Sequence, residues 1–212
     1  MSAVRTRSKR ILAALIACTF GAVASMVAGS QPAQAVTGHQ GYAVYRDGVF
    51  WNYTWHAGIL DDPTYNSSAY PVTMAPGGSS NVKYASWPAF LDGNKYVGLY
   101  RPNKAPTTAA RDNFIYMERK LIGEAIPYSL VYQVDYNWAT AGTWVDPAEI
   151  KGIRCDGVVE YVYEWYDYRV YGNDTYWDVT KSSFLGQDAH SGNAVTPSRQ
   201  AGFMTRITTA LP

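Results

Sequence analysis

One cysteine and one histidine are the residues of this 212-residue chain with the most distinctive chemistry. The chain contains two cysteines and three histidines, at Cys18, Cys155, His39, His56 and His190. A thiol attacks a carbonyl as the thiolate, and it needs an imidazole within hydrogen-bond reach as base. His56 stands in an apolar run, whereas His39 lies near an expected chain end and His190 in a polar loop. The pattern favours Cys155 as nucleophile and His56 as base; a buried inert cysteine and a core histidine are the alternatives.

The first 35 residues have the pattern of a secretory signal peptide. A basic segment, Arg5 to Arg10, precedes the apolar segment Ile11 to Ala28, and Ala33-Gln34-Ala35 is a cleavage signal. We therefore expect residues 1–35 to be removed, and residues 36–212 to form one secreted, extracellular domain with no stable membrane insertion. An uncleaved anchor and a lipoprotein lipidated at Cys18 are the alternatives.

Removal of this segment changes the charge and the cysteine count. The remaining chain has 14 basic and 17 acidic residues, a net charge of −3, and no Lys/Arg cluster, which argues against a nucleic-acid partner. Cys155 is then the one cysteine left, so an internal disulfide is excluded. Apolar residues make up 47% and aromatic residues 15% of the sequence, which excludes disorder as the main state.

The residues before position 102 are expected to form a small antiparallel sheet. Residues 41–60 read as a hairpin that turns at Arg46-Asp47-Gly48, and two more β runs follow at 70–75 and 96–101.

Helices and one more β run are expected after the sheet. Apolar residues recur at helical spacing in 107–122, and Asp146-Pro147-Ala148-Glu149 resembles a helix start. Cys155 is expected in the first turn of a helix over 155–165, whose N-terminus lowers a thiol pKa. Residues 167–179 read as β, and a short helix begins at about Pro197. The fold class is therefore α+β.

The order of these segments resembles a known enzyme family. The strand His56-Ala57-Gly58-Ile59, a helix that ends before Pro127-Tyr128, and the segment Arg154 to Tyr161 are similar to NlpC-type papain-fold cysteine hydrolases. Histidine precedes cysteine here, which is the order of the circularly permuted branch. That branch includes amidase-like proteins and relatives of lecithin:retinol acyltransferase. The resemblance covers roughly residues 41–166.

The resemblance implies a papain-like fold and a secreted cysteine peptidase or amidase. Cys155 would form a thioacyl enzyme and His56 would protonate the leaving group, with a peptidoglycan peptide as substrate. Tyr128 matches an active-site position, and Trp55 and Asp156 are expected to bind substrate with it. We expect a monomer without cofactor or metal.

A third polar residue usually orients the histidine in that family. If Leu60 pairs with Tyr70, the residue that faces His56 is Met74, and Thr73 points away. A thioether accepts hydrogen bonds weakly, so Met74 departs from the family pattern.

Other functions fit parts of the sequence. Trp51, Tyr53 and Trp55 alternate in one strand and could form the stacking face of a carbohydrate- or cell-wall-binding module. A lipid-directed acyl hydrolase or transferase is a further alternative. The carboxylates Asp156, Glu160 and Glu164 form one helix stripe, whereas a glycosidase needs two carboxylates across a cleft. Asp61 and Asp62 are expected to begin a turn rather than to bind a metal.

Overall fold

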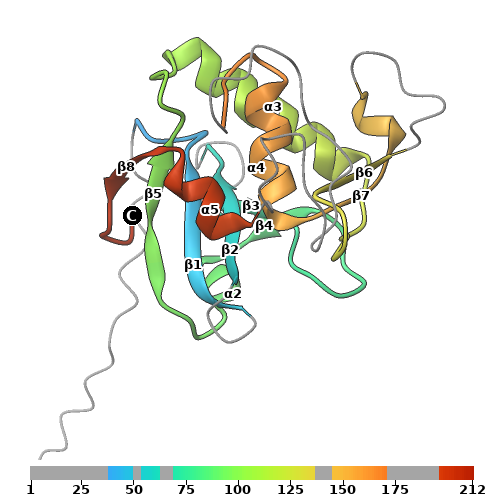
Figure 1. Ribbon diagram of the computed structural model, residues 1–212, viewed down its shortest axis with the longest axis horizontal. Coiled ribbons are helices and arrows are strands. Elements are labelled where there is room, and N and C mark those ends of the chain that lie inside the picture. Colours follow the sequence, from blue (N-terminus) through green and yellow to red (C-terminus); the bar gives the residue numbers. More distant parts are fainter. Residues whose placement is uncertain (1–37, 50–53, 63–68, 137–144, 171–195) are drawn as a thin grey trace, which may run out of the picture. The chain divides into compact units, whose positions relative to one another are not determined.

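A six-stranded antiparallel sheet organises the computed structural model, which describes residues 38–49, 54–62, 69–136, 145–170 and 196–212. The strands lie in the order β4-β3-β2-β1-β5-β8 (Figure 1). Their bounds are β1 Ala43–Val49, β2 Thr54–Leu60, β3 Val72–Met74, β4 Lys83–Ala85, β5 Tyr96–Arg101 and β8 Thr205–Thr208. The α+β class expected from the sequence is confirmed.

A second sheet and five helical segments complete the described part of the chain. The second sheet pairs β6 (Val134–Tyr136) with β7 (Ile150–Ile153). The helices are α2 (Trp87–Leu91), α3 (Thr108–Gly123), α4 (Cys155–Glu164) and α5 (Pro197–Gly202), and η1 (Pro147–Glu149) is a single 3₁₀ turn. Both α4 and α5 pack on β2 (Figure 1).

The two faces of the large sheet contribute to two apolar cores, because successive strand residues point to opposite sides. The helix-side core joins Ala43, Tyr45, Ala57 and Ile59 to residues of α3 and α4, among them Phe114, Leu121, Val158 and Val162. The α2-side core joins Val44, Leu60, Val72, Met74 and Leu99 to Trp87 and Phe90. Neighbouring residues of β2 therefore serve different cores.

The long helix forms where the apolar spacing predicts it. The hydroxyl of Thr107 accepts a hydrogen bond from the N–H of Ala110 at 3.1 Å, which caps the first turn of α3. Ala110, Phe114, Met117 and Leu121 are buried along one stripe. Gly123 is the last helical residue, so the expected helix and its end are confirmed within one residue.

The expected turn at Arg46-Asp47-Gly48 is wrong. These residues lie inside β1, where Arg46 pairs with His56 and Val49 pairs with Thr54. The register shifts between Arg46 and Val49, and Gly48 has a φ of 90°. An Asp-Gly pair suits such an irregularity as well as it suits a turn, because glycine reaches positive φ without strain.

Two further expectations are corrected in part. Asp146 begins the 3₁₀ turn η1 with a complete capping box, but the chain then enters β7 rather than a longer helix. The described part of the β run expected at 167–179, residues 167–170, is not a strand, and the rest lies outside the described residues. The short helix expected from Pro197 is confirmed as α5.

The described helices carry no membrane span: none in these ranges is both long enough and apolar enough to cross a bilayer. The expected signal peptide at 1–35, with Cys18, lies outside the described residues.

Candidate functional site

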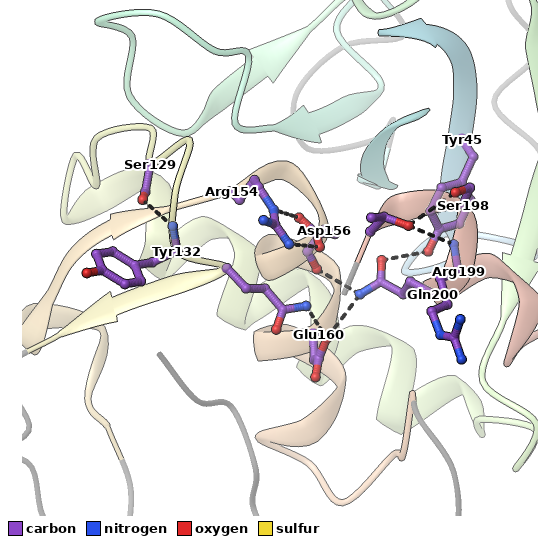
Figure 2. Close-up of polar contacts among 11 residues, drawn as sticks. Tyr45, Ser129, Tyr132, Arg154, Asp156, Glu160, Ser198, Arg199 and Gln200 are labelled. Atoms are coloured by element: carbon purple, nitrogen blue, oxygen red, sulfur yellow. Dashed lines mark hydrogen bonds and ion pairs between the residues drawn. The ribbon is translucent and has the colours of Figure 1, made fainter. Parts of the chain in front are cut away.

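Cys155 is the first residue of α4, as the sequence predicts. The N-cap residue Arg154 is extended, and its side chain makes no capping hydrogen bond to the helix. Instead, the Arg154 guanidinium binds both carboxylate oxygens of Asp156, with Nε at 2.6 Å and Nη2 at 2.7 Å (Figure 2). This bidentate pair is buried and fixes the turn that carries the thiol.

The sulfur of Cys155 lies against the backbone of β2. The N–H groups of Ala57 and Asp156 both hydrogen-bond to it, which favours the thiolate. Cys155 is nevertheless buried, with 5% of its surface exposed. Burial, and then the Asp156 carboxylate, raises the pKa of its thiol to about 12. The lowered pKa expected from the helix N-terminus is therefore wrong, because loss of water outweighs the helix dipole and the two N–H donors.

His56 is buried on the other side of β2 from Ala57. Its ring centre lies 5.6 Å from that of Phe90, and its Nε2 lies 3.3 Å from the sulfur of Met74. Burial, and then the nearby Arg46 guanidinium, lowers the pKa of His56 to about 3. The imidazole is therefore neutral at physiological pH.

The predicted contact between His56 and Met74 is confirmed, although the predicted register is wrong. Leu60 pairs with Val72 rather than with Tyr70, a shift of two residues. An even shift leaves every side chain on its expected face, so Met74 still reaches the imidazole. Thr73 points to the opposite face, as predicted, and is completely buried.

The structure brings Cys155 to the strand of His56 but does not join the two side chains. The sulfur meets the residue that follows His56, whereas the imidazole meets Met74 and Phe90. Between these two described residues no hydrogen bond is formed, so the expected thiol–imidazole contact is absent in this state. With Nε2 donating to Met74, Nδ1 is the ring nitrogen that can accept a proton.

The other predicted site residues have different surroundings. Tyr128 forms a bridge with Ile153, two residues before Cys155, and burial and then the thiol charge raise the pKa of its phenol. Trp55 is half-buried against the helix-side core, 6.4 Å from Tyr45 between ring centres. Asp156 is fully buried and its carboxylate is held by Arg154, and its role in substrate binding stays a prediction.

The carboxylates of the α4 stripe have structural partners. Figure 2 shows Gln200 of α5 between Tyr45, Asp156 and Glu160. Its amide nitrogen donates to the Asp156 carbonyl at 2.8 Å and to Glu160, and its amide oxygen accepts from Tyr45 at 2.8 Å. Glu164 pairs with Arg169 at 3.2 Å. The stripe is thus a set of buried polar contacts, in agreement with the rejection of a glycosidase pair.

Arg46 is a site residue that the sequence analysis missed. It pairs directly with His56 across the sheet, and its charge acts on both His56 and Cys155. The turn expected at 46–48 hid this pairing, because these residues belong to β1 itself and Arg46 pairs with His56.

The remaining candidates are metal-ligand groups, the other two histidines and the aromatic residues of the binding-module alternative. The ranges described above hold no group of three or more His, Cys, Asp and Glu side chains suited to a metal ion. Of the other histidines, His39 stacks near Tyr42 with 5.5 Å between ring centres, and His190 lies outside the described residues. Trp51 and Tyr53, which the binding-module alternative requires, also lie outside them.

In comparisons with known proteins, no family model, curated protein or solved structure matches this chain significantly.

Proposed function

We propose that this protein is a secreted cysteine hydrolase of the papain-like, permuted type, with Cys155 as nucleophile and His56 as base. The observation that carries the proposal is the position of Cys155. It is the first residue of helix α4, which packs on β2, the strand of His56, and two backbone N–H groups donate to its sulfur. A helix N-terminus beside a histidine strand is the arrangement that the resemblance implies.

The proposed reaction cleaves an amide or ester. The sulfur bonds to the carbonyl carbon while its proton passes to His56, and the backbone N–H of Cys155 stabilises the oxyanion. His56 then gives its proton to the leaving amine or alcohol, and water releases the acyl group from sulfur. Peptidoglycan stem peptides are the first substrate to test, on the resemblance alone.

The resting state of this site is protonated thiol and neutral imidazole. The order of the two pKa values, about 12 for Cys155 and about 3 for His56, opposes an ion pair before substrate arrives. The proposal therefore requires a rearrangement after substrate binding that brings the imidazole and the sulfur to the same face of β2, followed by the proton transfer. Before substrate binds, both the thiol and the imidazole are therefore uncharged, which distinguishes this site from one that holds a preformed thiolate.

Digestion of a defined muropeptide with the full chain tests the proposal. Mass spectrometry should find new soluble peptides with the unaltered chain and none with Cys155→Ser or His56→Gln. His39→Gln is the matched control, since it removes an imidazole outside the proposed site, and it should keep the activity. Products that survive Cys155→Ser would exclude the thiol mechanism. Retention on insoluble peptidoglycan without products would favour the binding module.

A further inference from the structure

Gln200 is a completely buried amide that makes three hydrogen bonds (Figure 2). Its oxygen accepts from the Tyr45 hydroxyl at 2.8 Å. Its nitrogen donates to the Asp156 carbonyl at 2.8 Å and to the Glu160 carboxylate at 3.3 Å, so both N–H groups and the oxygen are engaged. A methionine would fill the same space without needing polar partners, so volume alone does not require an amide here.

These contacts join the two backbone segments that hold the thiol. The sulfur of Cys155 accepts from the N–H groups of Ala57 and Asp156. Gln200 bonds directly to the carbonyl of Asp156, in the first turn of α4. Its other partner, Tyr45, is paired with Ala57 across β1 and β2. One side chain of α5 thus connects the helix start to the strand pair, and each end of this bridge carries one of the donors to the sulfur.

The bridge lies on the same face of the sheet as the sulfur. Tyr45, Ala57 and Cys155 all belong to the helix-side core, and α5 packs on β1, β2 and α4. The ion pair with Arg154 holds the side chain of Asp156, while Gln200 holds its main-chain carbonyl. Rotation of Asp156, which would carry its N–H away from the sulfur, is therefore opposed by two separate contacts.

We infer that Gln200 is a positioning residue for the Cys155 nucleophile, because it holds the start of α4 and the β1–β2 pair at the separation that lets both N–H donors reach the sulfur. The inference rests on the proposed function for the role of Cys155, and α5 lies outside the 41–166 region of the family resemblance. Hydrogen bonds to sulfur favour the thiolate, which is the form that attacks a carbonyl. Without the bridge, a smaller fraction of the thiol should be ionised.

Alkylation of Cys155 in the folded full chain tests this inference without any substrate. Iodoacetamide forms a sulfur–carbon bond and releases iodide while the thiol proton goes to solvent, and its rate follows the thiolate fraction. Gln200→Met keeps the length of the side chain and removes the amide. We expect its rate constant at pH 8 to fall about threefold, since a thiol whose pKa rises by about 0.5 has about threefold less thiolate. Mass spectrometry of the Cys155 peptide measures the rate.

A merely structural role gives the opposite sign. A weakened fold exposes a buried thiol and speeds its alkylation, so slower alkylation cannot come from lost stability. Ala201→Gly is the matched control, because it weakens α5 at the neighbouring buried position and leaves the amide in place. Its rate should be unchanged or higher. Tyr45→Phe, a milder variant that removes one end of the bridge, should slow alkylation as Gln200→Met does.

The outcomes separate the two proposals. An unchanged or higher rate in both Gln200→Met and Tyr45→Phe would overturn the role of Gln200 and leave the hydrolase proposal to the muropeptide assay. A folded thiol that resists iodoacetamide even at pH 9.5, in a chain whose unfolded form reacts, would sink both proposals.

Discussion

At the scale of single residues, the thioether of Met74 sets the behaviour of the candidate base. It accepts the Nε2–H of His56 weakly, at 3.3 Å, where an amide or carboxylate oxygen would accept it strongly. A weak acceptor holds the ring orientation loosely and does little to stabilise an imidazolium. His56 is therefore poorly equipped to act as a base in the resting state.

Met74→Asn should improve this base. The amide oxygen can accept from Nε2 and favours the charged ring, so we expect muropeptide hydrolysis to increase about tenfold and the pKa of His56 to rise. The pKa is measured by NMR titration of the imidazole. Met74→Leu is the control, which keeps the volume without an acceptor and should not raise either value. An unchanged pKa in Met74→Asn would show that this contact does not control the ring.

At the scale of elements, the start of α4 is held against the chain segment before β6. The N–H of Arg154 donates to the carbonyl of Gln133 at 2.9 Å. A Cβ on Gly157 would collide with that same carbonyl, so the helix can approach this closely because residue 157 is glycine. The close contact fixes where Cys155 stands.

Gly157→Ala should therefore destabilise the protein despite the higher helix propensity of alanine. We expect a loss of about 1–3 kcal/mol in the free energy of unfolding, measured by urea denaturation. Gly123→Ala, at the end of α3, is the matched control: open space surrounds its Cβ position, and it should be neutral or stabilising by up to about 1 kcal/mol. Equal effects of the two substitutions would contradict the close approach.

Much of this element structure is predictable from local pattern. The stripe from Ala110 to Leu121 and the apolar run after Cys155 identify α3 and α4, because helical periodicity is a property of short sequence. The contact of Met74 with His56 is also predictable, since face alternation survives a two-residue error in register. The hairpin turn is not, because an Asp-Gly pair serves a bulge within a strand equally well.

Contacts between distant residues are the part that the sequence does not reveal. Nothing local to Arg46 indicates that its charge lies beside His56, and nothing local to Cys155 shows that burial will raise its pKa. The Asp61 carboxylate illustrates the same limit. Its neighbours in the sequence indicate a turn, which lies outside the described residues, and give no sign of its 2.7 Å ion pair with Arg119 of α3, fifty-eight positions later.

At the scale of the whole molecule, Glu118 makes the fold sensitive to pH. Its side chain is completely buried, with both carboxylate oxygens lacking a hydrogen-bond partner, and Thr73, Asp61 and Arg119 lie around it. Burial, and then the charge of Asp61, raises the pKa of Glu118 well above its ordinary value of 4.5; Thr73 and Arg119 oppose this. The folded protein thus holds a proton that the unfolded chain releases above about pH 4.5.

The unaltered protein should lose stability as pH rises, because Glu118 must then ionise in a buried position, and Glu118→Gln should remove this loss. The free energy of unfolding falls wherever the folded state binds more protons, here from about pH 4.5 up to the raised pKa, by at most about 1.4 kcal/mol per pH unit. Thermal melts from pH 5 to 8 should show the Glu118→Gln variant gaining on the unaltered protein as pH rises. The exposed Glu124→Gln is the control and should track the unaltered protein. A constant difference would mean that Glu118 is already ionised in the fold.

The positions of Gln200 and β8 have a consequence for biosynthesis. Gln200 links Tyr45 of β1 to the first turn of α4, and β8 closes the edge of β5, yet both come long after these elements in the sequence. A nascent chain therefore has β5 uncovered and the Asp156 carbonyl without its amide donor until residues 196–208 have left the ribosome. A product truncated before them would have an unpaired sheet edge and an incomplete thiol-bearing turn.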